Sequence, residues 1–178
     1  MMIVANNYRR RKSVLTCTGS GAVYIEKKRG STATQSFMAA AAPSTIGELC
    51  RLFGRPAPEL QLDCIFCGNR LTNADKISFD LKALCLVWRR EGVLGACAKC
   101  CEQRAHDDCI KHTLCTLEGD GVEALTGKPL SHIVVRCRWC LGLLTYAEKE
   151  FCRTSRNPLL LVRRCWRGTC FNCLCKQE

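Results

Sequence analysis

The stretch Cys64-Ile65-Phe66-Cys67 begins a pattern of four Cys-x-x-Cys pairs that decides the fold of this chain. Each half of the pattern reads C-x2-C-x29-C-x2-C, and the second half repeats the first at an offset of 73 residues. Two such pairs bring four thiolates to one tetrahedral ion, as in a closed structural zinc site. The sequence therefore predicts two Zn²⁺ per chain. The predicted ligands are Cys64, Cys67, Cys97 and Cys100 for one ion, and Cys137, Cys140, Cys170 and Cys173 for the other.

The repeat extends beyond the cysteines. Thr145-x-x-Glu148 reads as a capping box, and Thr72-x-x-Asp75 is a weaker version of it, so we expect a short helix after the first pair of each half. Other matching positions include Leu71 and Leu144, Lys76 and Lys149, and Gly95 and Gly168. The simplest account is a duplicated domain. We predict an α+β fold of two homologous small zinc-binding domains joined by a connecting helix.

Composition favours metal over disulfides as the use of the cysteines. The 178 residues include 17 cysteines, an odd number, and the first residues lack the apolar run of a signal peptide. We therefore expect a reducing, intracellular compartment and no membrane span. The net charge of +11 is made up of +6 in residues 1–37 and +5 in the remainder. Eight thiolates with two zinc ions lower the latter to near +1, which weakens the case for a polyanion-binding domain.

The chain divides into three parts. Residues 1–37 are rich in Arg, Lys, Ser, Thr and Gly and are expected to be a disordered basic extension. Residues 38–113 should hold an N-terminal arm, the first zinc domain and the connecting helix, and residues 114–178 the second zinc domain. We expect a helix from Thr45 that ends near Gly54, and a connecting helix over 101–117. Strands are expected over 84–88, 133–136 and 159–164, with turns at 119–121 and at Gly127.

Several short motifs surround these cysteines. They are Leu62-Asp63-Cys64-Ile65-Phe66-Cys67, Leu84-Cys85-Leu86-Val87-Trp88-Arg89, Lys128-Pro129-Leu130, Val135-Arg136-Cys137 and Arg164-Cys165-Trp166-Arg167-Gly168-Thr169-Cys170. In these motifs and in its complete cysteine spacing, the chain resembles the papillomavirus early protein 6 family of viral oncoproteins over about residues 45–175.

The resemblance implies a groove between the two domains that captures an acidic Leu-x-x-Leu-Leu helix of a host protein. Such recognition places apolar anchors in a pocket and basic side chains at its rim. By motif position the pocket residues would be Ile65, Phe66, Leu84 and Val87, and Arg136 would be the basic contact. The family's further arginine beside the tryptophan is replaced by Cys165 here, so Arg164 or Arg167 must substitute. The connecting helix also departs from the family pattern, with Arg104, Asp107 and Asp108 at groove positions.

The function that the resemblance implies is that of an adaptor without enzymatic activity. Family partners include a host ubiquitin ligase whose targets are then degraded, the Mastermind-like coactivator of Notch signalling, and paxillin. Such capture would modulate host transcription, apoptosis and innate immunity from the host nucleus and host cytoplasm. The C-terminus, Cys175-Lys176-Gln177-Glu178, lacks the PDZ-binding pattern, so we expect no PDZ partner.

Two other functions stay open at this point. The basic clusters and the zinc would also suit a nucleic-acid-binding transcriptional regulator, and weak nucleic-acid binding or a homodimer is compatible with the adaptor interpretation. An enzyme is disfavoured because the eight thiolates fill two four-coordinate sites and leave no open metal position. His106, His112 and His132 are isolated in the sequence, and we expect surface or structural roles for them.

Overall fold

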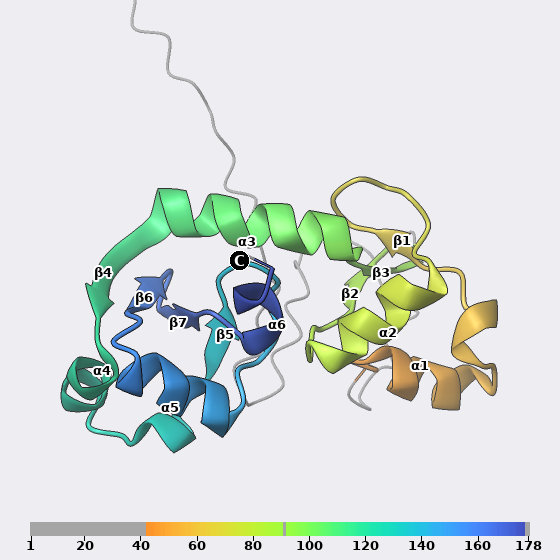
Figure 1. The fold of residues 1–178 in the computed structure, drawn as a ribbon. Coiled ribbons are helices and arrows are strands. Elements are labelled where there is room, and N and C mark those ends of the chain that lie inside the picture. The colour runs from red at the N-terminus through yellow and green to blue at the C-terminus, as the bar shows by residue number, and fades with distance from the viewer. Residues whose placement is uncertain (1–41, 91, 177–178) are drawn as a thin grey trace, which may run out of the picture.

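The structure is a computed structural model that describes residues 42–90 and 92–176. It has the expected α+β architecture, with two small domains that each hold one short sheet and one cysteine cluster. Helix α3 runs across both domains, as Figure 1 shows. The predicted disordered extension, residues 1–37, lies outside the described residues. None of the described helices is long and apolar enough to cross a membrane.

The first domain packs two helices against a three-stranded sheet of order β1-β3-β2, in which β1 is parallel to β3 and β2 antiparallel to it. The α1 helix begins after Thr45, whose side chain and Glu48 form a capping box, and ends at Gly54 in the left-handed conformation, as predicted. The elements are α1 (Ile46–Phe53), η1 (Ala57–Glu59), β1 (Asp63–Cys64), α2 (Asn73–Leu81), β2 (Val87–Arg89) and β3 (Gly92–Gly95).

The second domain repeats this plan and adds a strand at one edge. Its sheet has the order β4-β6-β7-β5, with β5 parallel to β7 and the other pairs antiparallel. The elements are β4 (Thr113–Leu117), α4 (Gly119–Thr126), η2 (Leu130–His132), β5 (Val135–Cys137), α5 (Tyr146–Thr154), β6 (Leu159–Val162), β7 (Cys165–Gly168) and α6 (Phe171–Leu174). The α3 helix (Ala98–His112) connects the domains. The predicted boundary between residues 113 and 114 stays a prediction.

A buried lysine holds the 3₁₀ turn in each domain, which confirms the repeat at the level of contacts. The Lys76 ammonium donates to the Ala57 carbonyl (2.8 Å) and the Pro58 carbonyl (3.3 Å). At the positions 73 residues later, Lys149 donates to the carbonyls of Leu130 (3.0 Å) and Ser131 (3.4 Å). A buried ammonium needs such acceptors, because an unpaired charge away from water is strongly unfavourable.

The paired glycines of the repeat also have a physical cause. A side chain at Gly95 would bring a Cβ to 2.9 Å from Leu71, and one at Gly168 would bring a Cβ to 2.9 Å from Leu144. Leu71 and Leu144 are themselves related by the 73-residue offset. In each domain the glycine therefore lets its strand lie close against a leucine of the segment that follows the first Cys-x-x-Cys pair.

The expected connecting helix over 101–117 is wrong at both ends. The helix starts earlier, at Ala98, and ends at His112, where the chain becomes the edge strand β4. The Thr113 hydroxyl donates to the Cys109 carbonyl, and residues 113–117 pair with β6. Pairing with a strand from the far end of the domain overrides the local helical pattern. As a result Leu114 lies on an exposed strand edge and not on a helix face.

The other expected elements are confirmed with shifts. Of the stretch 84–88 only residues 87 and 88 belong to a strand, β2, because Leu84 and Leu86 are buried in an irregular segment that follows α2. Strand β5 covers residues 135 and 136 of the expected stretch 133–136, and β6 covers residues 159–162 of the expected stretch 159–164. The turn expected at 119–121 is wrong, since α4 begins there, whereas Gly127 does end that helix in the left-handed conformation. Gly119 is buried against the side chain of Arg153, which explains a glycine inside a helix.

Helices α2 and α5 each end with a non-glycine residue in the left-handed region, Ala83 (φ 46°) and Arg156 (φ 51°). We predict that Arg156→Gly stabilises the second domain by roughly 0.5–1 kcal/mol, because a left-handed L-residue costs about 1–2 kcal/mol and the added chain entropy offsets about half of it. Urea unfolding of the zinc-loaded protein measures this. The matched control is Ser155→Gly, at φ −82°, which should destabilise. A lower stability for Arg156→Gly than for wild type would contradict the prediction.

Candidate metal centres and domain junction

The eight predicted ligand cysteines meet in two clusters of four. Within each cluster all four sulfur atoms lie within 4.8 Å of one another. The Cys67 and Cys97 sulfurs are 4.0 Å apart, and those of Cys140 and Cys170 are 3.8 Å apart. Four sulfurs at about 2.3 Å from a tetrahedral zinc ion are about 3.8 Å from each other, so the geometry fits Zn²⁺. The two clusters are therefore structural zinc centres, each closed by four protein ligands.

The electrostatics of the thiols also favour a bound cation. In the second cluster, hydrogen bonding from the Cys140 thiol lowers the pKa of Cys137 to about 4, although its burial opposes this. Burial, followed by the negative charge on Cys137, raises the pKa of Cys173 to about 12. Without an ion the four thiols thus cannot all ionise. A divalent cation replaces the retained protons and lets all four sulfurs carry charge.

Backbone amides donate hydrogen bonds to the sulfur of the first cysteine in each cluster. We call residues 64–68 the first zinc knuckle and residues 137–141 the second. The Cys97 amide donates to the Cys64 sulfur, and the Trp139 amide donates to the Cys137 sulfur, both at 3.4 Å. Such bonds stabilise the thiolate form and orient the ligands.

A carboxylate from the capping box supports the other half of each centre. Asp75 accepts a hydrogen bond from the Ala98 amide (2.8 Å), and Glu148 accepts one from the Phe171 amide (2.9 Å). Both amides belong to the first residue of a helix that contains one ligand and has a second ligand as its N-cap residue. Although partial burial alone would raise it, the amides of Ala98 and Thr72 and the Thr72 hydroxyl lower the pKa of Asp75 below its ordinary value. The first domain therefore ties α2, the start of α3 and the metal centre together.

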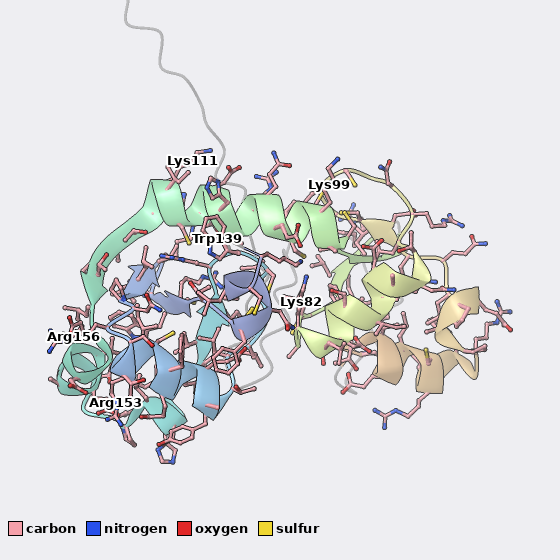
Figure 2. The ribbon with its side chains drawn as sticks, in the orientation of Figure 1. Lys82, Lys99, Lys111, Trp139, Arg153 and Arg156 are labelled. Carbon is pink, nitrogen blue, oxygen red and sulfur yellow. The ribbon has the colours of Figure 1, made fainter. Side chains whose placement is uncertain are left out.

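Each knuckle also presents an aromatic side chain to α3. The guanidinium of Arg104 lies over the Phe66 ring, 4.9 Å from its centroid. The His106 ring stacks on Trp139 with centroids 5.4 Å apart and an interplanar angle of 20°. Phe66 and Trp139 are equivalent under the repeat. Helix α3 is therefore held by both zinc knuckles, and Figure 2 shows Trp139 directly below it.

A small pocket lies next to this stack. Its volume is about 370 Å³, and it is lined by Glu102 of α3, Trp139 of the second knuckle, and Cys173 and Lys176 at the C-terminal end. Neither Trp139 nor the pocket was predicted from the sequence, although the 73-residue offset that relates Phe66 to Trp139 points to the tryptophan.

The structure brings some of the predicted peptide-binding residues together. Ile65 and Phe66 of the first knuckle and Val87 of β2 are half-buried and lie in the first domain near β3, since Ile65 bonds to Gly95 and Val87 pairs with Leu94. Leu84 is 1% exposed and belongs to the apolar core of the first domain. It supports this surface from beneath and offers no free surface of its own.

Arg136 lies at the contact between the domains. Its guanidinium donates to the carbonyls of Lys82 (2.7 Å) and Ala83 (2.9 Å) in the first domain and of Leu141 (2.9 Å) in the second. It is 3% exposed, and its burial, followed by the charge of Arg167, lowers its pKa. In this arrangement the guanidinium is committed to backbone carbonyls and not to the solvent-facing rim.

Arg167 is the neighbour of Arg136 across the β5–β7 ladder. It is 5% exposed, yet its Nε and Nη1 atoms have no hydrogen-bond partner. Among the described residues neither arginine lies within ion-pair distance of a carboxylate. Arg164 is exposed in the turn after β6, beside Arg163, whose amide bonds to His112 at the end of α3. The two proposed substitutes for the missing family arginine are thus in very different surroundings.

The fold and the two four-cysteine centres define a tandem zinc-domain protein with a shared helix. A family model described as Early Protein (E6) matches residues 64–173. Protein E6 of human papillomavirus type 60 is 37% identical over 132 residues, covering 74% of this chain and 93% of that protein. Protein E6 of human papillomavirus type 8 is 37% identical over 131 residues, covering 74% of this chain and 84% of that protein.

The chain belongs to the papillomavirus E6 early-protein family. Among solved structures, the solution structure of the C-terminal zinc-binding domain of the HPV51 oncoprotein E6 aligns with 36% of this chain and 84% of that domain, at 26% identity and a TM-score of 0.34.

We predict two zinc ions per chain in the purified protein and one in each of the variants Cys67→Ser and Cys140→Ser. Zinc binding contributes about 10–16 kcal/mol in small zinc domains, so each variant should unfold its own domain and leave the other folded. Metal analysis together with amide NMR spectra measures both effects. Cys115→Ser, a cysteine outside both clusters, is the control and should keep two ions. Retention of two ions in either ligand variant would contradict the assignment.

Proposed function

We propose that the protein is an adaptor that captures an acidic Leu-x-x-Leu-Leu helix of a host protein at the junction of its two zinc domains. Membership of the E6 family supports a role in the capture of host proteins. Helix-in-groove recognition requires an apolar surface beside basic side chains. Among the described residues, Ile65, Phe66 and Val87 are the apolar candidates and Arg167 is the basic candidate, and the proposal rests mainly on Arg167.

The observation that carries the proposal is the buried, incompletely paired guanidinium of Arg167. Buried polar groups in native proteins are nearly always hydrogen-bonded, and a buried charge without a partner is strongly unfavourable. Two such donors on one arginine, next to a second arginine, would favour the binding of a carboxylate. An acidic side chain of a partner would supply the acceptors and the opposite charge.

The apolar part of the surface would come from Ile65, Phe66 and Val87. Half-buried apolar side chains in a free protein are ready to lose their remaining exposed area on binding. Arg104, which covers the Phe66 ring, would have to move aside or face an acid of the peptide. This explains how a basic residue on α3 is compatible with a groove at a position where the family pattern has an apolar one.

The adaptor would carry no chemistry of its own, because its zinc centres are closed by four thiolates each. We propose that the captured partners are a host ubiquitin ligase, the Mastermind-like coactivator or paxillin. Their capture in the host nucleus and host cytoplasm would alter host transcription, apoptosis and innate immunity. The choice among these partners depends on residues of the peptide outside the leucines.

Titration of the zinc-loaded protein with a panel of such peptides by calorimetry tests the proposal. Arg167→Gln should weaken binding about tenfold or more, since it removes a charge-assisted bond of roughly 1.5–3 kcal/mol. The same variant should fold at least as stably as wild type, because the free protein no longer buries an unpaired charge. Arg164→Gln is the matched control, exposed in the turn after β6, and should change neither property.

Peptides in which every acid is replaced by its amide should lose the difference between wild type and Arg167→Gln. The proposal fails if no acidic peptide of the panel binds the wild type. It also fails if Arg167→Gln binds all of them as the wild type does. A loss caused by Arg164→Gln instead would move the basic contact to the turn after β6.

Leu84 is a poor site for the same test. Truncation of a fully buried leucine costs about 2–5 kcal/mol of folding stability. We therefore predict that Leu84→Ala lowers the unfolding midpoint in urea, and that any loss of peptide binding follows the loss of folded protein. Val87→Ala, which alters a half-buried residue, should reduce binding with a smaller change in stability. Equal stability of Leu84→Ala and wild type would show that this leucine is not part of the core.

A further inference from the structure

The second zinc knuckle contains a leucine where the first contains a glycine. Gly68 and Leu141 each follow the second cysteine of their knuckle and are related by the 73-residue offset. Both adopt the left-handed conformation, with φ 73° at Gly68 and φ 66° at Leu141. The amide of each donates to the carbonyl of the first cysteine of its knuckle, at 2.8 Å from Gly68 to Cys64 and at 3.0 Å from Leu141 to Cys137. The turns are thus the same, and only glycine adopts this conformation without strain.

The side chain of Leu141 does not pack into its own domain. Leu141 is 4% exposed and belongs to the apolar core cluster of the first domain, whose other members lie between Ile46 and Ala105. The cluster of the second domain is made of residues 122–173 and does not include it. A strained residue persists only where its surroundings compensate, so the compensation for Leu141 comes from the other domain.

The backbone around Leu141 makes further contacts across the same junction. One Arg136 nitrogen donates both to the Leu141 carbonyl and to the Lys82 carbonyl of the first domain, and a second donates to Ala83. A Cβ at Gly142 would be 3.8 Å from the Lys82 side chain. Figure 2 shows Lys82 where the two domains face each other. The end of α2 and the second knuckle therefore form a contact in addition to α3.

If α3 were the only link, the two domains could still rotate relative to each other about this helix. It is fixed to the first domain by its two zinc ligands and by Asp75, and it packs on the second through Trp139 and β6. One attachment along one helix allows the domains to rotate about it. A second attachment away from the helix removes that rotation, and the contact at Leu141 is placed to do so.

We propose that Leu141 is a positioning residue that, together with Arg136, fixes the two zinc domains relative to each other before a partner binds. Its side chain closes the junction on the side of α2, and Arg136 holds the carbonyls around it. This deepens the proposed function, because a groove between domains has a defined width only if the domains are fixed. Leu141 would therefore favour helix capture without touching the peptide.

The central test compares Leu141→Gly with wild type in the full, zinc-loaded chain. Glycine suits the left-handed turn, so the second domain should keep its zinc and its own amide spectrum, and only the junction should be lost. Residual dipolar couplings measure this: one alignment tensor should fit both domains of the wild type, whereas the variant should need two tensors of different magnitude. Leu141→Met, which keeps an apolar side chain, should restore the single tensor.

A second variant separates strain from packing. Gly68→Leu places the same side chain at the equivalent position of the first knuckle, where a Cβ would meet nothing within 4 Å. It should lower the stability of the first domain and leave the single tensor unchanged. Affinity for an acidic Leu-x-x-Leu-Leu peptide should fall several-fold in Leu141→Gly and recover in Leu141→Met.

Each result of these experiments either supports or overturns the inference about Leu141. One tensor in Leu141→Gly with both zinc ions bound would overturn the inference, since the domains would be fixed without this residue. Loss of the second zinc ion in Leu141→Gly would also overturn it, because Leu141 would then stabilise its own domain. Two tensors in the variant support the inference whether or not any peptide binds. Absence of peptide binding to the wild type would affect only the proposed function.

Discussion

Coordination of a divalent cation by four thiolates is the interaction on which both domains depend. Each domain encloses a core too small to be comfortably stable, and its short strands contribute few ladder bonds. The cation joins the first turn of the domain to the helix that follows its last strand. Because a buried cluster of thiols cannot lose all its protons without a compensating charge, the metal decides whether these segments attract or repel one another. The sheet, the capping boxes and the buried lysines then orient what the metal has brought together.

The shared helix makes the two centres into one assembly. The α3 helix starts at the first centre, where Cys97 and Cys100 bind the metal, and passes over the second knuckle, where Trp139 meets His106. A partner bound at the junction would therefore contact elements whose positions are set by both ions. Phe66 and Trp139 are equivalent under the repeat, and both contact α3, but their partners differ. Phe66 faces Arg104, while Trp139 faces the imidazole ring of His106.

Local patterns with a stereochemical cause were predictable from the sequence. The cysteine spacing, the threonine capping boxes and the glycine after α1 each describe a requirement of a few neighbouring residues. The errors arose where distant residues decide. The residues after His112 became a strand because β6 pairs with them, and Leu84 became core because it shares an apolar cluster with residues of α1, α2 and the first half of α3. The position of Arg136 at the domain contact depends on carbonyls 53 and 54 residues away, and no local pattern describes such a contact.

The two buried lysines have a consequence for chemical labelling of this protein. An acylating reagent needs an accessible, unprotonated amine, and the ammonium groups of Lys76 and Lys149 are covered and engaged by carbonyl oxygens. Lys99, Lys111 and Lys128, by contrast, are exposed and open to reagent. Modification of Lys76 thus requires opening of the first domain, and modification of Lys149 requires opening of the second. A mass-spectrometric time course of acylation would report the opening of each domain separately in the wild-type chain, without any substitution.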